Sequence, residues 1–299
     1  MKMNHWITLF LLASISGSSF IFTRALAPVL GPIVTADLRM LIAGLALVAY
    51  SAMVGFNLEW RRYWRLYAIV GVINSGLPFL LYSFAALYLP AAYLAIVNSS
   101  APLFGALFSA IWLSERLTYS KMMGLMLGMV GVGMISYSGS AAHISTMFGV
   151  GIAACIVAAM CYALSGIYIK RFAKEIKPIA MASGSQVAAG VLMLPFCAVD
   201  PVAIGAITPT VVMNMAALAL LCSAIAYLIY FRLIAEVGPT KTLTVTFVSP
   251  FFAMLFGAIF LGEGITLRML AGAATIIFAT VLVNGLWKSY ALTARTKSN

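Results

Sequence analysis

Long apolar stretches separated by short polar joints make up almost the whole chain. Each stretch approaches the length of about 20 apolar residues that an α-helix needs to cross a bilayer. Joints that are polar or rich in proline and glycine separate ten such segments, at 6–27, 32–54, 66–87, 91–113, 120–138, 148–170, 178–199, 210–235, 239–261 and 269–288. The pattern predicts an all-α membrane protein with ten transmembrane helices.

The first segment has features of a signal peptide, because Lys2 precedes it and the small residues Ala13 and Ser14 lie inside it. It stays apolar well beyond any small-residue cleavage site. We therefore expect an uncleaved first transmembrane helix.

The composition excludes a water-soluble globule. Of the 299 residues, 64% are hydrophobic and 8% are charged, against roughly 25% charged in an ordinary soluble domain. A compact chain with so few charges would expose contiguous apolar surface that soluble proteins do not tolerate. We expect a multi-pass protein of the bacterial inner (plasma) membrane, surrounded by the lipid bilayer and acting as a monomer.

The positive charges predict the orientation in the membrane. A net charge of +11 does not indicate a nucleic-acid partner here, because nucleic-acid binders gather such charge on one soluble face. If the N-terminus is cytoplasmic, 15 of the 18 Lys and Arg residues lie on the cytoplasmic side, and only Arg24, Arg39 and Arg268 lie toward the other. Cytoplasmic loops carry such an excess, so we expect both termini in the cytoplasm.

The chain contains an internal repeat. A shift of 148 residues aligns 68–136 with 216–284 without a gap, and 15 of the 69 positions are identical, against about six expected from composition alone. The identities include the rare pairs Pro102/Pro250 and Glu115/Glu263. A weaker match at a shift of 146 places Ser19 on Ser165 and so extends the repeat to the first helix of each half.

The repeat predicts the domain organisation. We expect a first five-helix repeat at 1–138, an external linker at 139–147, a second repeat at 148–288 and a cytoplasmic tail at 289–299. Because each half holds an odd number of spans, the second repeat must enter the membrane from the opposite side. Inverted repeats are typical of transporters that work by alternating access, so the pattern favours a transporter over a channel or a structural duplication.

Two paired segments carry a family resemblance: NSSAPLFGALFSAIWLSERLTYSKMMG at 98–124 and TFVSPFFAMLFGAIFLGEGITLRMLAG at 246–272. Each holds a mid-helix proline, a Leu-x-Glu at the helix end and a glycine in the next helix. With ADLRMLIAGL at 36–45, they resemble the EamA-type branch of the drug/metabolite transporter (DMT) superfamily, and within it the YddG-type amino-acid exporters. The second half departs from this pattern, because MASGSQVAAG at 181–190 lacks the arginine that Arg39 supplies. The resemblance implies a ten-helix exporter whose central cavity is lined by the first, third, fourth, sixth, eighth and ninth helices.

Polar side chains on those helices are the candidates for binding a small-molecule substrate, because polar groups inside lipid must face protein or water. The candidates are Ser19, Asn74, Tyr82, Asn98, Tyr162, Ser165, Ser223, Tyr227, Tyr230 and Thr246. Spacing by four residues places several of them on a common helix face. For each Ser or Thr, a hydrogen bond to a carbonyl of its own helix is at least as good an explanation. The cavity is favoured for Asn74, Asn98, Tyr82 and Tyr227.

Three mid-span prolines are candidate hinges. Proline removes a helix hydrogen bond and kinks the chain, and Pro78, Pro102 and Pro250 lie near the middle of their segments. For the repeat-related pair Pro102 and Pro250 we favour a hinge over a static kink. For Pro78 the two interpretations are equally good.

Three charged residues lie toward the outer end of the first two helices. Arg24, Asp37 and Arg39 could compensate one another's charge as an ion-pair cluster, which would be a structural lock or an external gate. We favour the lock.

The scarcity of intramembrane carboxylates narrows the cargo, since only Asp37 is plausibly inside the membrane. Exchange of protons for organic cations needs a central carboxylate in the first helix, and phosphate-bearing cargo would need Lys or Arg in the cavity, so both classes are disfavoured. We expect export of neutral or zwitterionic solutes, above all aromatic or other neutral amino acids, which tyrosine rings and amides can hold. Purines or other neutral metabolites, and a passive channel-like facilitator, remain alternatives.

Catalytic and cofactor chemistry is not expected. An intramembrane enzyme needs a nucleophile with a base, a carboxylate pair or a metal site. The histidines, His5 and His143, lie at the N-terminus and in an outer loop, and the four cysteines lie in apolar segments without CxxC spacing. We therefore expect no catalytic residue, no metal and no cofactor. Proton coupling stays open, with Asp37 as its one candidate.

Overall fold

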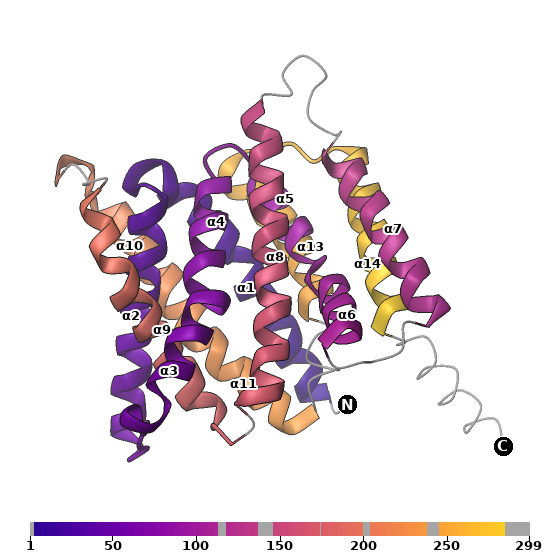
Figure 1. The fold of residues 1–299 in the computed structure, drawn as a ribbon. Coiled ribbons are helices and arrows are strands. Elements are labelled where there is room, and N and C mark those ends of the chain that lie inside the picture. The colour runs from indigo at the N-terminus through magenta and orange to yellow at the C-terminus, as the bar shows by residue number, and fades with distance from the viewer. Residues whose placement is uncertain are drawn as a thin grey trace.

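The computed structural model describes residues 3–112, 118–136, 146–173, 175–199, 204–237 and 245–284. Every regular element in these ranges is a helix, and the helices stand side by side in one bundle (Figure 1). Seven of the described helices are long and apolar enough to cross a membrane, and two shorter apolar helices cover Val248–Leu261 and Leu267–Leu282. This confirms the expected all-helical membrane protein. The count of ten spans and the orientation stay predictions.

The helices of the first half follow the apolar segments. Their bounds are α1 (Met3–Leu30), α2 (Pro32–Met53), α3 (Trp60–Gly71), a π-helix η1 (Val72–Gly76), α4 (Leu77–Ala85), α5 (Ala91–Asn98), α6 (Ala101–Trp112) and α7 (Tyr119–Ser136). The turn from α1 to α2 passes through Gly31 at φ 76°, a conformation that glycine adopts without steric cost. Pro32 then starts α2, where its missing N–H costs nothing.

The second half repeats this order in part, with two additional short helices, η2 and η3. Its elements are α8 (Thr146–Phe172), α9 (Pro178–Met193), η2 (Leu194–Ala198), η3 (Ile204–Ala206), α10 (Pro209–Ala216), a π-helix η4 (Ala217–Ile225), α11 (Ala226–Val237), α13 (Val245–Leu261) and α14 (Leu267–Asn284). The first residues of α1 and the last residues of α14 lie at the same end of the bundle (Figure 1). Most of the expected linker, at 139–145, and the tail at 289–299 fall outside the described residues.

Close glycine contacts join the two halves at α2 and α9. A Cβ on Gly44 would lie 2.7 Å from Cγ2 and 2.8 Å from the amide nitrogen of Val187, and a Cβ on Gly190 would lie 2.5 Å from Cδ2 of Leu41. The two contacts are equivalent in the repeat, because a shift of 146 residues carries Gly44 onto Gly190 and Leu41 onto Val187. Small residues let membrane helices approach closely. The contact therefore follows the internal repeat.

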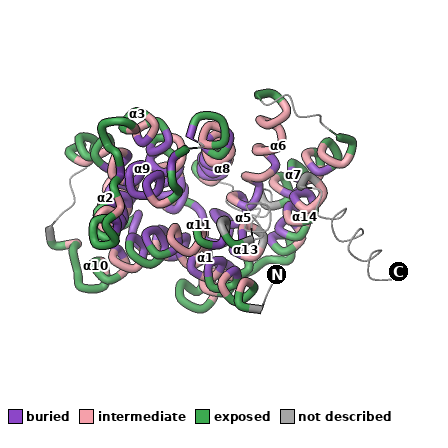
Figure 2. The backbone as a smooth tube through the Cα atoms, turned by 90° about the horizontal axis from the view of Figure 1, so that it is seen from below, coloured by how far each residue is buried: buried purple, intermediate pink, exposed green. Residues whose placement is uncertain are grey.

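Most residues of α9 are buried (Figure 2). Large apolar side chains on the outer faces, such as Phe10, Leu45 and Val191, are at least half exposed. In a lipid environment such exposure carries no penalty, because the acyl chains are as apolar as the side chains. The exposed faces are therefore those that the bilayer covers.

The two π-helices occupy equivalent places in the repeat. A shift of 148 residues carries η1, at 72–76, onto 220–224, which lies inside η4. The identical pair Ser75 and Ser223 lies on these π-helices. Short π-helical stretches inside α-helices are frequent at functional sites, so the π-helices identify this level of the bundle as a candidate site.

The candidate hinge prolines have different surroundings. Pro78 follows η1 at the start of α4, and Pro102 is the second residue of α6, just after a break at Ser99 and Ser100. Pro250, the repeat partner of Pro102, lies inside the unbroken helix α13. The two halves thus hold the same proline in two different local structures. Whether the prolines act as hinges stays a prediction.

Candidate functional site

A chain of hydrogen bonds links three helical elements in the middle of the bundle. The Ser165 hydroxyl on α8 donates to Oδ1 of Asn74 at 3.1 Å. Nδ2 of Asn74 on η1 donates to the hydroxyl of Tyr227 on α11 at 3.4 Å. The structure therefore brings these three predicted site residues together and connects the two halves through uncharged polar groups.

Aromatic rings and a second amide form the neighbouring part of the site. The Tyr82 hydroxyl donates to Oδ1 of Asn98 at 2.8 Å, where α5 ends. The rings of Tyr82 and Tyr162 stack at 6.1 Å between centroids with 23° between planes, and Phe20 meets Tyr82 edge-on at 5.6 Å. These contacts bring α1, α4, α5 and α8 together around flat, largely apolar surfaces.

Arg39 on α2 lies at the same level of the bundle. Its Nε donates to the Ser223 hydroxyl at 2.8 Å, and its Cζ lies 3.9 Å from the centroid of the Phe79 ring. The Ser223 hydroxyl in turn donates to the carbonyl oxygen of Leu218, five residues earlier, at 3.1 Å. Ser223 precedes Tyr227 by one helical turn. Arg39 is thus adjacent to the central polar chain. The sequence did not predict this position of Arg39.

The three charged residues predicted to form a cluster do not pair with one another. Arg24 donates to the carbonyl oxygen of Ala86, and Arg39 donates to Ser223. The Asp37 side chain is 1% exposed, its Oδ1 has no hydrogen-bond partner, and it lies beside Cys197. The expected ion-pair cluster is therefore not present, because neighbouring helices offer each arginine an acceptor of its own.

We expect Asp37→Asn to leave the free energy of unfolding within about 0.5 kcal/mol of the wild type or to raise it. The substitution removes a buried carboxylate without breaking an ion pair, and an unpaired buried charge is costly. Thermal unfolding of the detergent-purified protein measures the change. Removal of one partner of a buried ion pair costs about 3–5 kcal/mol. A loss of that size would support the hypothesis that Asp37 belongs to an ion-pair lock.

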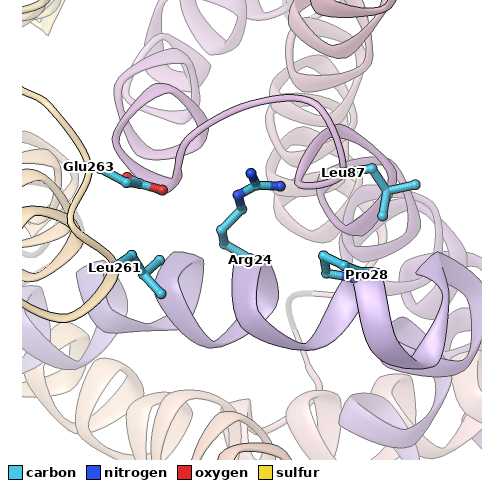
Figure 3. A pocket seen from close by; sticks show the side chains of 5 residues that line it. All are labelled: Arg24, Pro28, Leu87, Leu261 and Glu263. Carbon is cyan, nitrogen blue, oxygen red and sulfur yellow. The ribbon is translucent and has the colours of Figure 1, made fainter. Parts of the chain in front are cut away.

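A pocket of about 490 Å³ lies toward the end of the bundle that is predicted to face outward. It is lined by Arg24, Pro28, Leu87, Leu261 and Glu263, and Figure 3 shows Arg24 and Glu263 reaching it from different segments. Oε1 of Glu263 accepts a hydrogen bond from the Ala91 amide at 2.9 Å, at the start of α5. A carboxylate at a helix N-terminus is favourable, because it lies at the positive end of the helix dipole. Glu263 thereby connects the α13–α14 loop to the first half.

At the opposite end, α1 and α11 are joined by charged groups. His5 lies 3.5 Å from Oε2 of Glu236, and Nε of Arg232 donates to Oε1 of Glu236 at 2.8 Å. The hydrogen bond from Arg232 lowers the pKa of Glu236. The first helix therefore borders the pocket at one end and contacts α11 at the other.

The remaining predicted site residues are Ser19, Tyr230 and Thr246. The Ser19 hydroxyl donates to the carbonyl oxygen of Ser16 at 2.7 Å, which is the local alternative expected for a helical serine. Tyr230 packs against an apolar cluster that includes Leu12 and Leu26. Thr246 lies half-buried near the start of α13.

Sequence reasoning missed Gln186 and Phe79. Gln186 on α9 is 0% exposed, lies beside Tyr227, and neither atom of its side-chain amide has a hydrogen-bond partner. A lone glutamine in an apolar span is a signal in the sequence, because polar side chains in membranes mark functional sites. Phe79 carries no such signal, since only its position under Arg39 distinguishes it from other apolar residues.

Comparisons with known proteins identify the family of this chain. The pattern of the EamA-like transporter family matches residues 4–137 and 149–285. The uncharacterized transporter YvbV of Bacillus subtilis is 29% identical over 85% of this chain and 82% of its own length. A probable terminal-alkyne amino-acid exporter of Streptantibioticus cattleyicolor is 24% identical over 82% of each chain.

A solved crystal structure shares the fold, with a TM-score of 0.64 at 17% identity, and the match covers 97% of this chain and 99% of that one. The family pattern matches nearly the whole chain, in two ranges that resemble each other as the paired segments do. This protein is therefore a membrane transporter that belongs to the EamA-like transporter family of the drug/metabolite transporter superfamily.

Proposed function

We propose that the protein exports neutral or zwitterionic solutes, above all amino acids, across the bacterial inner membrane. The observation that carries this proposal is the chain of uncharged groups from Ser165 through Asn74 to Tyr227. Amides and hydroxyls can hold amino and carboxylate groups, and the stacked rings of Tyr82 and Tyr162 suit an apolar or planar side chain. The relative named as an amino-acid exporter supports the same class of cargo.

The transport cycle we propose is alternating access by a monomer with ten spans and both termini in the cytoplasm. Two observations support it. The pocket beside Arg24 and Glu263 lies at one end of α1, while His5 and Glu236 join α1 to α11 at the other. The repeat-related helices also differ, since the chain is broken before Pro102 and continuous through Pro250. An exchange of these two local structures would convert one state into the other.

Counterflow in proteoliposomes tests the proposal. Vesicles preloaded with unlabelled phenylalanine should accumulate labelled phenylalanine transiently above equilibrium, and the initial rate should saturate. Saturation and counterflow distinguish a carrier from a channel-like facilitator. Protein-free vesicles are the control. Uptake that does not saturate, or counterflow driven by adenine or tetraphenylphosphonium but not by amino acids, would contradict the proposal.

A further inference from the structure

Two contacts hold the guanidinium of Arg39 in the middle of the bundle. Its Nε donates to Ser223, and its Cζ lies over the ring of Phe79. The ring face and the single acceptor hold the group in place but use only one of its five N–H donors. The fork formed by Nη1 and Nη2 therefore determines what else Arg39 can bind.

That fork has no protein acceptor among the described residues. Neither terminal nitrogen makes a hydrogen bond there, and no described carboxylate lies within 4.0 Å of the guanidinium. Asp37, two residues away on α2, lies beside Cys197 instead. A charged side chain inside a membrane is costly unless it is paired, so Arg39 lacks the anion that would compensate its charge.

A carboxylate fits this position better than other anions. The two parallel N–H groups of the fork match the two oxygens of a carboxylate. One guanidinium compensates one negative charge, and Arg24, the arginine of α1, donates to the carbonyl oxygen of Ala86 instead. A phosphate ester, with a charge between −1.5 and −2 at about neutral pH, would remain partly uncompensated.

The surroundings of Arg39 suit the rest of such a molecule. Gln186 is buried beside Tyr227 with both amide atoms unsatisfied, and Asn74 donates to the same tyrosine. Buried polar groups without partners are rare in native structures. Their occurrence next to an uncompensated cation indicates a site built for a polar ligand rather than a packing contact.

We propose that Arg39 binds the carboxylate of the cargo, so that the transporter selects solutes that carry a free carboxylate. This inference rests on the proposed export of amino acids and names the group by which they are recognised. No Lys or Arg was expected in the cavity from the sequence, and the proposed role of Arg39 revises that expectation.

Competition against phenylalanine counterflow tests the inference. The competitors are 3-phenylpropionate, which keeps the carboxylate and lacks the amine, and phenylalaninamide and phenethylamine, which lack the carboxylate. In the wild type, 3-phenylpropionate should compete at concentrations at least tenfold lower than the other two. Arg39→Gln should abolish this preference, and Arg39→Lys should restore part of it, because a lysine keeps the charge without the fork.

Arg62→Gln is the matched control, because Arg62 is an exposed arginine on α3 that contacts Glu59 and Glu175. It should keep the full preference for the carboxylate. Thermal stabilisation of the detergent-purified protein by 3-phenylpropionate gives a second measurement that does not depend on transport. It should occur with the wild type and the control and be absent with Arg39→Gln. If Arg39→Gln is unstable, Arg39→Lys is the variant that tests the inference. A preference for 3-phenylpropionate as strong as that of the wild type in Arg39→Lys overturns the inference.

The outcomes separate this inference from the proposed function. If the wild type binds 3-phenylpropionate through Arg39 but shows no amino-acid counterflow, the role of Arg39 stands and amino acids are the wrong cargo. If amino acids are transported and Arg39→Gln keeps the tenfold preference, the function stands and the role of Arg39 is wrong. If the wild type shows neither stabilisation nor preference, Arg39 does not bind a carboxylate.

Discussion

Gly44→Ala is expected to lower the free energy of unfolding by about 1–3 kcal/mol, the usual cost of overpacking a close-packed interior. The added methyl group would lie 2.7 Å from Cγ2 and 2.8 Å from the amide nitrogen of Val187. A backbone atom cannot move aside as a flexible side chain can, so α2 and α9 must separate. The same movement would displace the neighbouring Gln186, whose carbonyl carbon would lie 3.2 Å from the new methyl group.

Thermal unfolding of the detergent-purified protein, followed by size-exclusion chromatography, measures this loss. Gly166→Ala is the matched control, because Gly166 also lies within a long helix, α8, and a Cβ there would meet nothing within 4 Å. Alanine is the better helix former by about 1 kcal/mol, so the control should be as stable as the wild type or more stable. Equal unfolding temperatures for Gly44→Ala and Gly166→Ala would show that α2 and α9 are not closely packed.

Asn74→Leu is expected to lower the initial rate of counterflow at least tenfold. Leucine has the same branched skeleton of four side-chain heavy atoms as asparagine, but it removes the acceptor of Ser165 and the donor to Tyr227. The Ser165 hydroxyl would then lose its acceptor inside the bundle, which costs about 1–3 kcal/mol for a buried group left unsatisfied. The Tyr227 hydroxyl would lose one of its donors. The geometry of the site, rather than the fold as a whole, should change.

Thr35→Val is the control for Asn74→Leu. Thr35 is also buried on a membrane helix, but its hydroxyl donates to the carbonyl oxygen of Gly31 at 2.7 Å, one turn earlier. Its removal should leave the rate within about twofold of the wild type, because a local hydrogen bond connects no other helix. A wild-type rate for Asn74→Leu, measured at equal amounts of folded protein, would exclude Asn74 from the transport site.

The central polar chain could be predicted in part. Positions four residues apart share a helix face, which placed Asn74 and Tyr82 on one side of the third segment. Both side chains do make contacts between helices, Asn74 with Ser165 and Tyr82 with Asn98. The Ser19 hydroxyl instead donates to a carbonyl oxygen of its own helix, because a serine hydroxyl reaches such a carbonyl as easily as a neighbouring helix.

The charged residues could not be placed in the same way. Arg24, Asp37 and Arg39 lie near one another along the chain, and this proximity suggested an ion-pair cluster. In the structure, Ala86 and Ser223 accept from the two arginines. These partners come from residues 62 and 184 positions away, and no periodicity along α1 or α2 contains them.

The sequence by itself determined that the chain is a helical membrane protein, because apolar segments in lipid must satisfy their backbone hydrogen bonds internally. It also determined the internal repeat and most of the polar groups available to a site. Only the tertiary structure decided which of those groups meet, that Arg39 faces Ser223 and Phe79, and that the paired prolines have different surroundings. Helical periodicity sets the face of a side chain on its own helix, whereas its partners depend on how each helix is rotated and shifted against its neighbours.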